Sequence, residues 1–234
     1  MFTRAALSLK GSALLSTTGL CVQQGLRCCT LVKPIIGLTG PTGAGKSAVA
    51  AAFHRHGCAV VDADQVARKT AEEPHCLSML KEAFGKTIIR ADGSLDRHAL
   101  ADLAFSSPKN TEKLNSITHP AILSECKKQL SAATCSDSVA VILDAPLLFE
   151  CGAQKFCNAT VAVITPDSSR LGRIMARDGV TEVEAKERMA SQHGNEYYLK
   201  LADYSFDGSI EWSILDDKAS ELLKRILRDF YERP

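Results

Sequence analysis

The sequence lacks any excess of charge, because 28 Lys and Arg residues stand against 27 Asp and Glu residues in a chain of 234. Nucleic acids and anionic membrane surfaces attract proteins with a strong positive excess. We therefore expect neither as the main partner, and any positively charged site must be local. An obligate protein partner is not evident either, nor is an internal repeat or a low-complexity segment.

The sequence also lacks a CxxC pair, although it has nine cysteines. Only Cys28 and Cys29 are adjacent, and the others are scattered singly. This spacing argues against a zinc site or a thioredoxin-type centre. A disulfide framework is unexpected in an α/β chain of this size, so we expect reduced and mostly buried thiols.

Acidic residues are missing from the first 61 positions, since Asp62 is the first. Residues 1–33 carry four charges, all positive, and many Ser and Thr residues. This composition is typical of a mitochondrial transit peptide, so we predict a targeting extension over 1–33 and a mitochondrial location, with the cytoplasm as the alternative. A secretory signal and an untargeted extension remain open, but residues 11–26 are too polar to span a bilayer, so we expect no integral membrane segment.

Beyond Pro34, short apolar runs alternate with helical patterns. Strands are predicted over 35–38, 59–61, 139–143, 159–164 and, more briefly, 204–206. Helices are predicted over 46–56, 168–192 and 215–231. This alternation predicts an α/β fold with a parallel sheet covered on both faces.

A long helical pattern without a strand of useful length runs from Gln65 to about Leu130. It is interrupted by Gly85, by Asp92-Gly93 and by His119-Pro120, which we interpret as a turn or a helix start. The segment is too long for one crossover connection, so we predict a helical insertion.

A Walker A pattern, GxxxxGK[ST], connects the first predicted strand to the first predicted helix. Its residues are Gly40, Pro41, Thr42, Gly43, Ala44, Gly45, Lys46 and Ser47. The glycines let backbone N–H groups surround phosphate oxygens at a helix N-terminus. Lys46 would reach the β and γ phosphates of ATP, and the Ser47 hydroxyl would bind Mg²⁺. The alternative is a glycine-rich turn that binds no ligand.

Acidic residues follow two of the predicted strands. Asp62 and Asp64 end the second strand, at the edge of a parallel sheet that also carries the Walker A loop. One of them could accept the proton of an attacking hydroxyl, and the other could support Mg²⁺ or cap the following helix. Asp144 follows a strongly apolar strand and could order Mg²⁺, or it could simply cap the strand end.

Arg170, Arg173 and Arg177 are spaced to share one face of a helix, where like charges repel unless an anion neutralises them. A mobile lid that brings arginines onto ATP phosphates would explain the spacing. An ordinary solvated face with pairing to Asp167 and Asp178 is the alternative.

Taken together, the motifs resemble those of the dephospho-coenzyme A kinase family, from Ile35 to about Asp207. The ordered set is as follows: Gly37-Leu38-Thr39-Gly40, Val61-Asp62-Ala63-Asp64, Ala67-Arg68, Phe84-Gly85, Asp92-Gly93, Asp96-Arg97, His119-Pro120, Asp144, Pro146-Leu147-Leu148-Phe149-Glu150, Arg173, Arg177-Asp178, Arg188-Met189, Gln192 and Ala202-Asp203. Walker A alone identifies a superfamily, whereas this ordered set is specific.

The resemblance implies a P-loop NTPase three-layer sandwich with a helical substrate subdomain and a lid. A kinase domain would cover 34–234, with its core over 34–66, 136–166 and 200–234. The coenzyme A subdomain would cover about 67–135, and the lid about 167–195.

The same resemblance implies phosphoryl transfer from MgATP to the ribose 3′-hydroxyl of dephospho-coenzyme A, which is the last step of coenzyme A biosynthesis. It implies Asp64 as the base and Arg173 and Arg177 as lid arginines, acting with Lys46. Arg97 and His119 would belong to the acceptor region together with Asp62, and Mg²⁺ on Ser47 could have help from Asp62 or Asp144.

The sequence departs from the family pattern at two positions. Gly208 stands where an Asn is frequent, and Tyr198 stands where a basic residue is common. These departures concern adenine-side and lid contacts. Two other functions share the Walker A loop and the paired acids: a nucleotide or shikimate type of P-loop kinase, and a non-enzymatic module switched by ATP.

Overall fold

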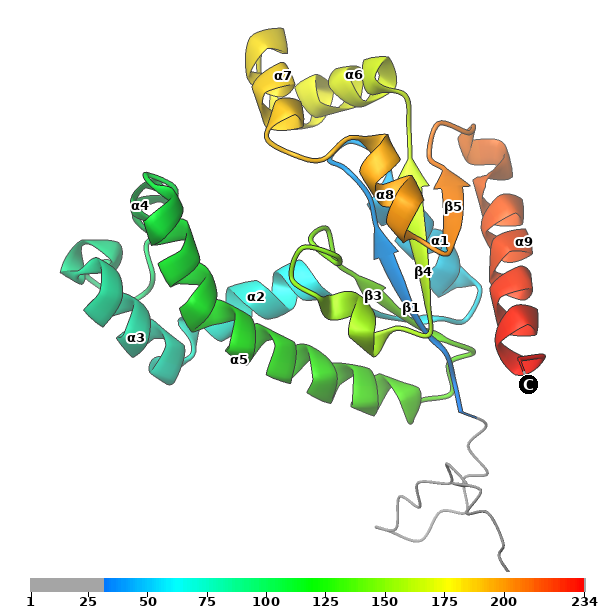
Figure 1. Ribbon diagram of the computed structural model, residues 1–234, viewed down its shortest axis with the longest axis horizontal. Coiled ribbons are helices and arrows are strands. Elements are labelled where there is room, and N and C mark those ends of the chain that lie inside the picture. The colour runs from blue at the N-terminus through cyan, green and yellow to red at the C-terminus, as the bar shows by residue number, and fades with distance from the viewer. Residues whose placement is uncertain (1–31, 234) are drawn as a thin grey trace, which may run out of the picture. The chain divides into compact units, whose positions relative to one another are not determined.

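The computed structural model describes residues 32–233 and contains the predicted parallel sheet (Figure 1). Its five strands lie in the order β2-β3-β1-β4-β5, and every neighbouring pair is parallel. The strands are β1 (Ile35–Thr39), β2 (Ala59–Asp62), β3 (Val141–Asp144), β4 (Ala159–Ile164) and β5 (Tyr204–Asp207). Because β1 is central, the loop that follows it lies at the middle of the carboxyl edge of the sheet, where ligands bind in open α/β folds.

Helices cover both faces of the sheet, which confirms the predicted layers. On one face α1 (Lys46–Arg55) and α9 (Trp212–Tyr231) pack against Ile36, Ile142 and Val161. On the other face α5 (Pro108–Thr134) and the 3-10 helix η2 (Ala153–Phe156) pack with Val141 and Leu143. Alternate residues of β3 therefore enter opposite core layers, as the two-residue period of a strand requires.

The predicted helical insertion consists of four α-helices and one 3-10 helix. They are α2 (Ala63–Glu72), α3 (Pro74–Phe84), η1 (Lys86–Ile88), α4 (Arg97–Ala104) and α5. They enclose a small core of their own around Leu80, Ile88 and Leu100. The breaks predicted at Gly85 and Asp92-Gly93 are confirmed: Gly85 ends α3, and Asp92 accepts the backbone N–H of Ser94 at 2.9 Å in a turn.

The break predicted at His119-Pro120 is wrong, because α5 runs through both residues. A proline inside a helix lacks the N–H that would bond the carbonyl of Ser116, so the helix loses one hydrogen bond there. Thr118 is buried on the N-terminal side of the proline. On its C-terminal side, Cys126 and Leu130 are buried against the sheet. This packing on both sides of the proline holds the helix together.

The helix predicted over 168–192 is two helices, α6 (Asp167–Asp178) and α7 (Glu182–Ala190). Gly179 ends α6 in a left-handed conformation, and Thr181 and Glu184 form a capping box at the start of α7. Both signals were visible in the sequence. Helix α8 (Asn195–Leu201) was not anticipated, β3 begins at Val141 instead of 139, and α9 begins at Trp212 instead of 215.

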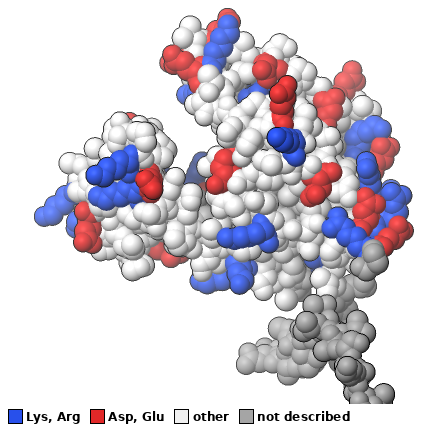
Figure 2. Space-filling model, in the orientation of Figure 1, with Lys and Arg blue, Asp and Glu red and all other residues white. Residues whose placement is uncertain are grey.

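Basic and acidic side chains are interspersed on the face shown in Figure 2. None of the helices between residues 32 and 233 is long and apolar enough to cross a bilayer.

Phe53 offers a test of the packing between α1, α9 and the sheet, since its side chain is completely buried there. Phe53→Ala should lower the free energy of unfolding by about 3 to 5 kcal/mol, because it removes a buried ring and leaves a cavity. Urea denaturation with an unchanged m-value measures this loss. The control is Phe105→Ala, since Phe105 is 69% exposed. Equal losses in the two variants would contradict the packing.

Candidate active site

The Walker A loop leaves β1 and turns into α1, as the sequence predicted. Gly45 is the N-cap of α1 and has a φ of 96°, a left-handed conformation that glycine adopts without strain. No side chain caps this helix start, and no acidic residue lies in its first turn. The first N–H groups of α1 and the positive end of its dipole are therefore available to an anion.

The loop opens into a cavity of about 960 Å³. All eight residues of the Walker A pattern line it, and so do several residues from distant parts of the chain. Those that the argument below uses are Asp64, Arg173, Arg177, Gly208 and Trp212. The structure thus brings Lys46, Ser47, Asp64 and the two predicted lid arginines together in one site.

Lys46 forms an ion pair with Asp144, with 3.7 Å between Nζ and Oδ1. Both side chains are less than one-fifth exposed. Oδ1 of Asp144 is buried and accepts no hydrogen bond from the described residues. Burial raises the pKa of Asp144, the Lys46 charge opposes this rise, and Asp62 and Asp64 add to it. The Lys46 ammonium group thus acts on two carboxylates at the edge of the sheet, those of Asp144 and Asp64.

Asp62 and Asp64, which the sequence could not tell apart, have different surroundings. Asp62 is the N-cap of α2 and accepts the backbone N–H of Gln65 at 3.0 Å. It lines a smaller cavity of about 390 Å³ together with Ser47 and Asp144. Asp64 lies in the first turn of α2 and lines the large cavity beside Lys46.

The pKa of Asp64 is raised mainly by burial and also by the Asp62 charge, while Lys46 and Arg68 lower it. A carboxylate with a raised pKa is a stronger base than an ordinary aspartate. Asp64 is therefore the better placed of the two to accept a proton from a group bound in the large cavity.

The oxygen atoms of Ser47, Asp62 and Asp144 fit a magnesium ion in chemical type, because Mg²⁺ prefers hydroxyl, carboxylate and water oxygens. Oδ1 of Asp144 pairs with Lys46 but accepts no hydrogen bond within the described residues, and this is the observation that favours such an ion. Within residues 32–233, however, no three His, Cys, Asp or Glu side chains converge in the manner of an all-protein metal site. This agrees with the usual way Mg²⁺ is held, by one or two protein groups plus phosphates and water.

The three arginines of α6 make different contacts. Arg170 is only 2% exposed; its Nε donates to the carbonyl of Thr42 at 2.9 Å, and its Nη1 donates to Asp167 at 2.8 Å. Arg173 lines the cavity and donates to the carbonyls of Gly208 at 2.9 Å and Gly43 at 3.3 Å.

Arg177 also lines the cavity, and it forms a two-point pair with Asp178 at 2.7 and 3.0 Å. Asp178 in addition accepts from Arg188 at 2.7 Å. The pairing with Asp167 and Asp178 that we considered as an alternative is thus present for Arg170 and Arg177, yet Arg173 and Arg177 still face the cavity.

Sequence reasoning missed three contacts that fix the loop in place. Gln192 accepts the backbone N–H of Thr42 at 2.9 Å, and the buried hydroxyl of Thr165 donates to the carbonyl of Ala44 at 2.9 Å. A Cβ atom at Gly208 would collide with the same carbonyl of Ala44, so the segment after β5 approaches the loop too closely for any side chain at this position. No local pattern marks such contacts, since the partners are far apart in sequence.

Tyr198, the second departure from the family pattern, is 2% exposed and lies against Glu150 at the cavity wall. Its pKa rises to about 12, through burial first and the Glu150 charge second. It therefore stays neutral and supplies no positive charge where a basic residue is common.

The structure does not bring Arg97 and His119 into the cavity around Lys46. Arg97 begins α4 and pairs with Glu72 at 2.8 Å, and His119 lies within α5. Their assignment to the acceptor region stays a prediction.

Comparison with known proteins agrees with the fold and the motifs. The family model described as dephospho-CoA kinase matches residues 34–212. A dephospho-CoA kinase of Corynebacterium glutamicum is 39% identical over 193 residues, which is 82% of this chain and 96% of the relative. One of Carboxydothermus hydrogenoformans is 39% identical over 184 residues, covering 77% of this chain and 89% of the relative.

Solved structures give the same result. A crystal structure from Thermus thermophilus matches with a TM-score of 0.72 and 32% identity over 84% of this chain and 97% of the other. A dephospho-CoA kinase from Campylobacter jejuni matches with a TM-score of 0.65 and 25% identity over 84% and 98%.

The predicted mitochondrial location is wrong, because these relatives are bacterial proteins and nothing points to a mitochondrion. The prediction depended on the composition of residues 1–33, of which 1–31 lie outside the described residues. Four positive charges without an acidic residue are a weak signal, because a short segment can have that composition without being a targeting signal.

The ordered motifs, the parallel sheet around a Walker A loop and the match over residues 34–212 lead to one conclusion: the chain belongs to the dephospho-CoA kinase family.

Proposed function

We propose that the large cavity is where this chain performs the reaction of its family, the ATP-dependent phosphorylation of dephospho-CoA on its ribose 3′-hydroxyl, giving coenzyme A and ADP. The observation that carries the proposal is the presence of Lys46, Ser47 and Asp64 in the cavity that the Walker A loop lines. ATP use follows from membership in a P-loop kinase family.

Lys46 would supply positive charge to the β and γ phosphates. Phosphoryl transfer passes through a loose transition state, so positioning and charge stabilisation provide most of the catalysis. Asp144 holds Lys46 at the edge of the sheet before the phosphates arrive. The ion pair thus holds the Lys46 ammonium group at the position that we propose for the transferred phosphoryl group.

Asp64 would accept the proton of the 3′-hydroxyl as that oxygen attacks the γ phosphorus. Its place in the large cavity and its raised pKa support this role, whereas Asp62 is occupied as a helix cap. Ser47 with Asp62 or Asp144 would hold Mg²⁺, which neutralises charge on the phosphate oxygens when bound.

Arg173 and Arg177 would close over the phosphates as lid arginines. In the structure Arg173 donates to backbone carbonyls and Arg177 donates to Asp178. An incoming phosphate can replace these partners. We further propose the division into a core over 34–66, 136–166 and 200–234, a coenzyme A subdomain over about 67–135 and a lid over about 167–195.

The test is direct: purified protein is incubated with ATP and dephospho-CoA, and coenzyme A and ADP are measured. Nucleosides and shikimate serve as competing acceptors. Formation of coenzyme A alone supports the proposal. Transfer to another acceptor would indicate a different P-loop kinase, and nucleotide binding without transfer to any acceptor would indicate a binding module.

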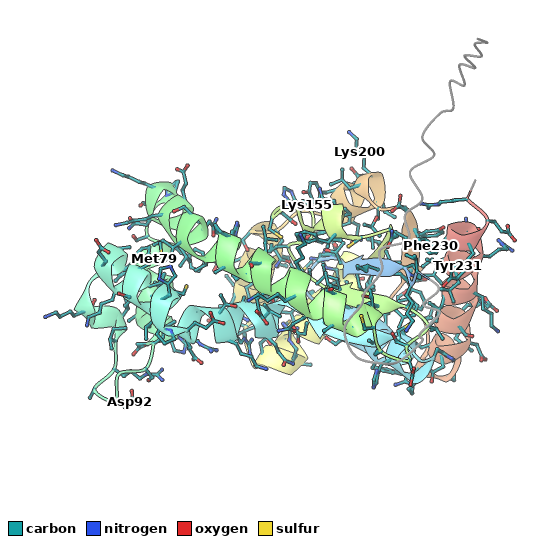
Figure 3. The ribbon with its side chains drawn as sticks, turned by 90° about the horizontal axis from the view of Figure 1, so that it is seen from below. Met79, Asp92, Lys155, Lys200, Phe230 and Tyr231 are labelled. Carbon is teal, nitrogen blue, oxygen red and sulfur yellow. The ribbon has the colours of Figure 1, made fainter. Side chains whose placement is uncertain are left out.

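Lys46→Ala should abolish transfer, because it removes the charge that meets the β and γ phosphates. The matched control is Lys200→Ala, since Lys200 is exposed and projects outward from α8 (Figure 3). A loss in kcat below about tenfold would contradict the role of Lys46, since about 1.4 kcal/mol is too little for it.

Asp64→Asn should lower kcat by about a hundredfold or more, with a smaller change in affinity for ATP, as expected for a lost base. Asp62→Asn should be much milder, because an asparagine can still accept the backbone N–H of Gln65 as a helix cap. Steady-state kinetics of both variants decide the matter. The reverse order of effects would transfer the role of base to Asp62.

Arg173→Ala and Arg177→Ala should lower kcat/KM more than they weaken ATP binding, because the lid contacts strengthen in the transition state. Their effects should be non-additive in the double variant, since both arginines serve one charge cluster. Arg55→Ala is the control, because Arg55 forms its ion pair with Asp216 on the surface. Unchanged kcat/KM in both single variants would show an ordinary solvated face.

A further inference from the structure

We propose that Trp212 forms one wall of the site for the purine base of ATP, and that the protein recognises this base by its flat face rather than by hydrogen bonds to its edge. The inference rests on the proposed function for the placement of the triphosphate, and it adds the residue that binds the base.

Trp212 is unusually placed for a tryptophan. It is the only one in the chain, and its side chain is 78% exposed although it lines the cavity of the Walker A loop. It begins α9, a helix that buries Leu215, Leu223 and Ile226 against the sheet. Trp212 therefore contributes little to the core, and its large flat surface is available to a ligand.

The order of the strands decides which end of ATP meets this residue. The carboxylates that would surround the reacting phosphate follow β2 and β3, on one side of the central β1. Trp212 follows β5, on the opposite side, beyond β4. A triphosphate that lies in the loop with its γ phosphate toward Asp64 directs its nucleoside toward β4, β5 and Trp212.

The segment that carries Trp212 is held firmly against the loop. Gly208 lies so close to Ala44 that no side chain fits between them, and its carbonyl accepts from Arg173 at 2.9 Å. The distance between the phosphate site and the tryptophan is therefore set by packing before any ligand binds. This is the preorganisation that a base-binding wall requires.

The same contacts leave few groups to read the edge of a base. The N–H of Gly208 donates to the carbonyl of Ile164 at 2.8 Å, and the N–H of Ser209 donates to Asp207 at 2.8 Å. The neighbouring cavity residues Ile210 and Leu215 have apolar side chains. Beside Trp212 this segment therefore offers stacking and apolar contact, and stacking is tolerant of base identity because every base has a π-face.

The experiment uses the full chain and its single tryptophan as the reporter. Saturating ADP should quench or shift the intrinsic fluorescence, because the base covers the indole. Trp212→Ala should raise the KM for ATP by about fivefold to about a hundredfold, as expected for the loss of one base–aromatic stack. The KM for dephospho-CoA should change less than about twofold, since that substrate meets the other side of β1.

Two further variants and one substrate make the test specific. Trp212→Phe should keep most of the affinity, because a phenyl ring still stacks. Ile214→Ala is the control, since Ile214 is 44% exposed on the same helix and does not line the cavity. GTP should replace ATP with a loss in kcat/KM of less than about tenfold.

An unchanged KM for ATP in Trp212→Ala, or fluorescence that saturating ADP leaves unaltered, would overturn the inference. So would a loss with GTP much above about tenfold, because it would show that the edge of the base is read. If the wild-type protein formed no coenzyme A, the proposed function would fail. Calorimetric titration of wild-type protein and Trp212→Ala with ADP would then still decide the role of Trp212.

Discussion

The parallel register of the sheet is the constraint on which the site depends. Because β2, β3 and β1 run in the same direction and pair Asp62 with Asp144 and Asp144 with Leu38, the residues that follow these strands meet at one edge. The Walker A loop follows β1 at that edge. The hydrogen bonds of the backbone therefore bring the acids and the Walker A loop together, although Lys46 and Asp144 are 98 positions apart in the sequence.

At this edge, neighbouring cations compensate the carboxylates of Asp64 and Asp144 only in part. Burial and mutual repulsion raise the pKa values of Asp64 and Asp144, and only Lys46 and Arg68 oppose this for Asp64. A further cation near these carboxylates would stabilise their ionised form. A triphosphate with its metal ion would bring both signs of charge, and Asp64 would then meet the hydroxyl that must lose its proton.

Helix α6 and the residues that follow β4 and α7 hold the loop in place. Arg170, Arg173, Thr165 and Gln192 all bond to backbone groups of residues 42–44. Arg170, Arg173 and Thr165 donate to carbonyls and so occupy none of the N–H groups of the loop; Gln192 occupies only that of Thr42. The loop thus obtains its shape from tertiary contacts as well as from its glycines, which is a reason for its rigidity.

Local patterns in the sequence determined the strands, the Walker A loop and the list of candidate site residues. A buried parallel strand is an apolar run in the sequence, which can be recognised from neighbouring residues alone. The run over 159–164 accordingly forms β4 with the same ends.

The sequence did not separate Asp62 from Asp64, since spacing puts both at the edge of the sheet. Their surroundings differ because Asp62 caps α2 and Asp64 lines the large cavity. Helix α5 continues through Pro120 because packing on the sheet outweighs a local preference, and Arg170 is buried because Thr42 lies beside it. Tertiary structure alone decided these outcomes, since the contacts that fix them join residues whose proximity no local pattern records.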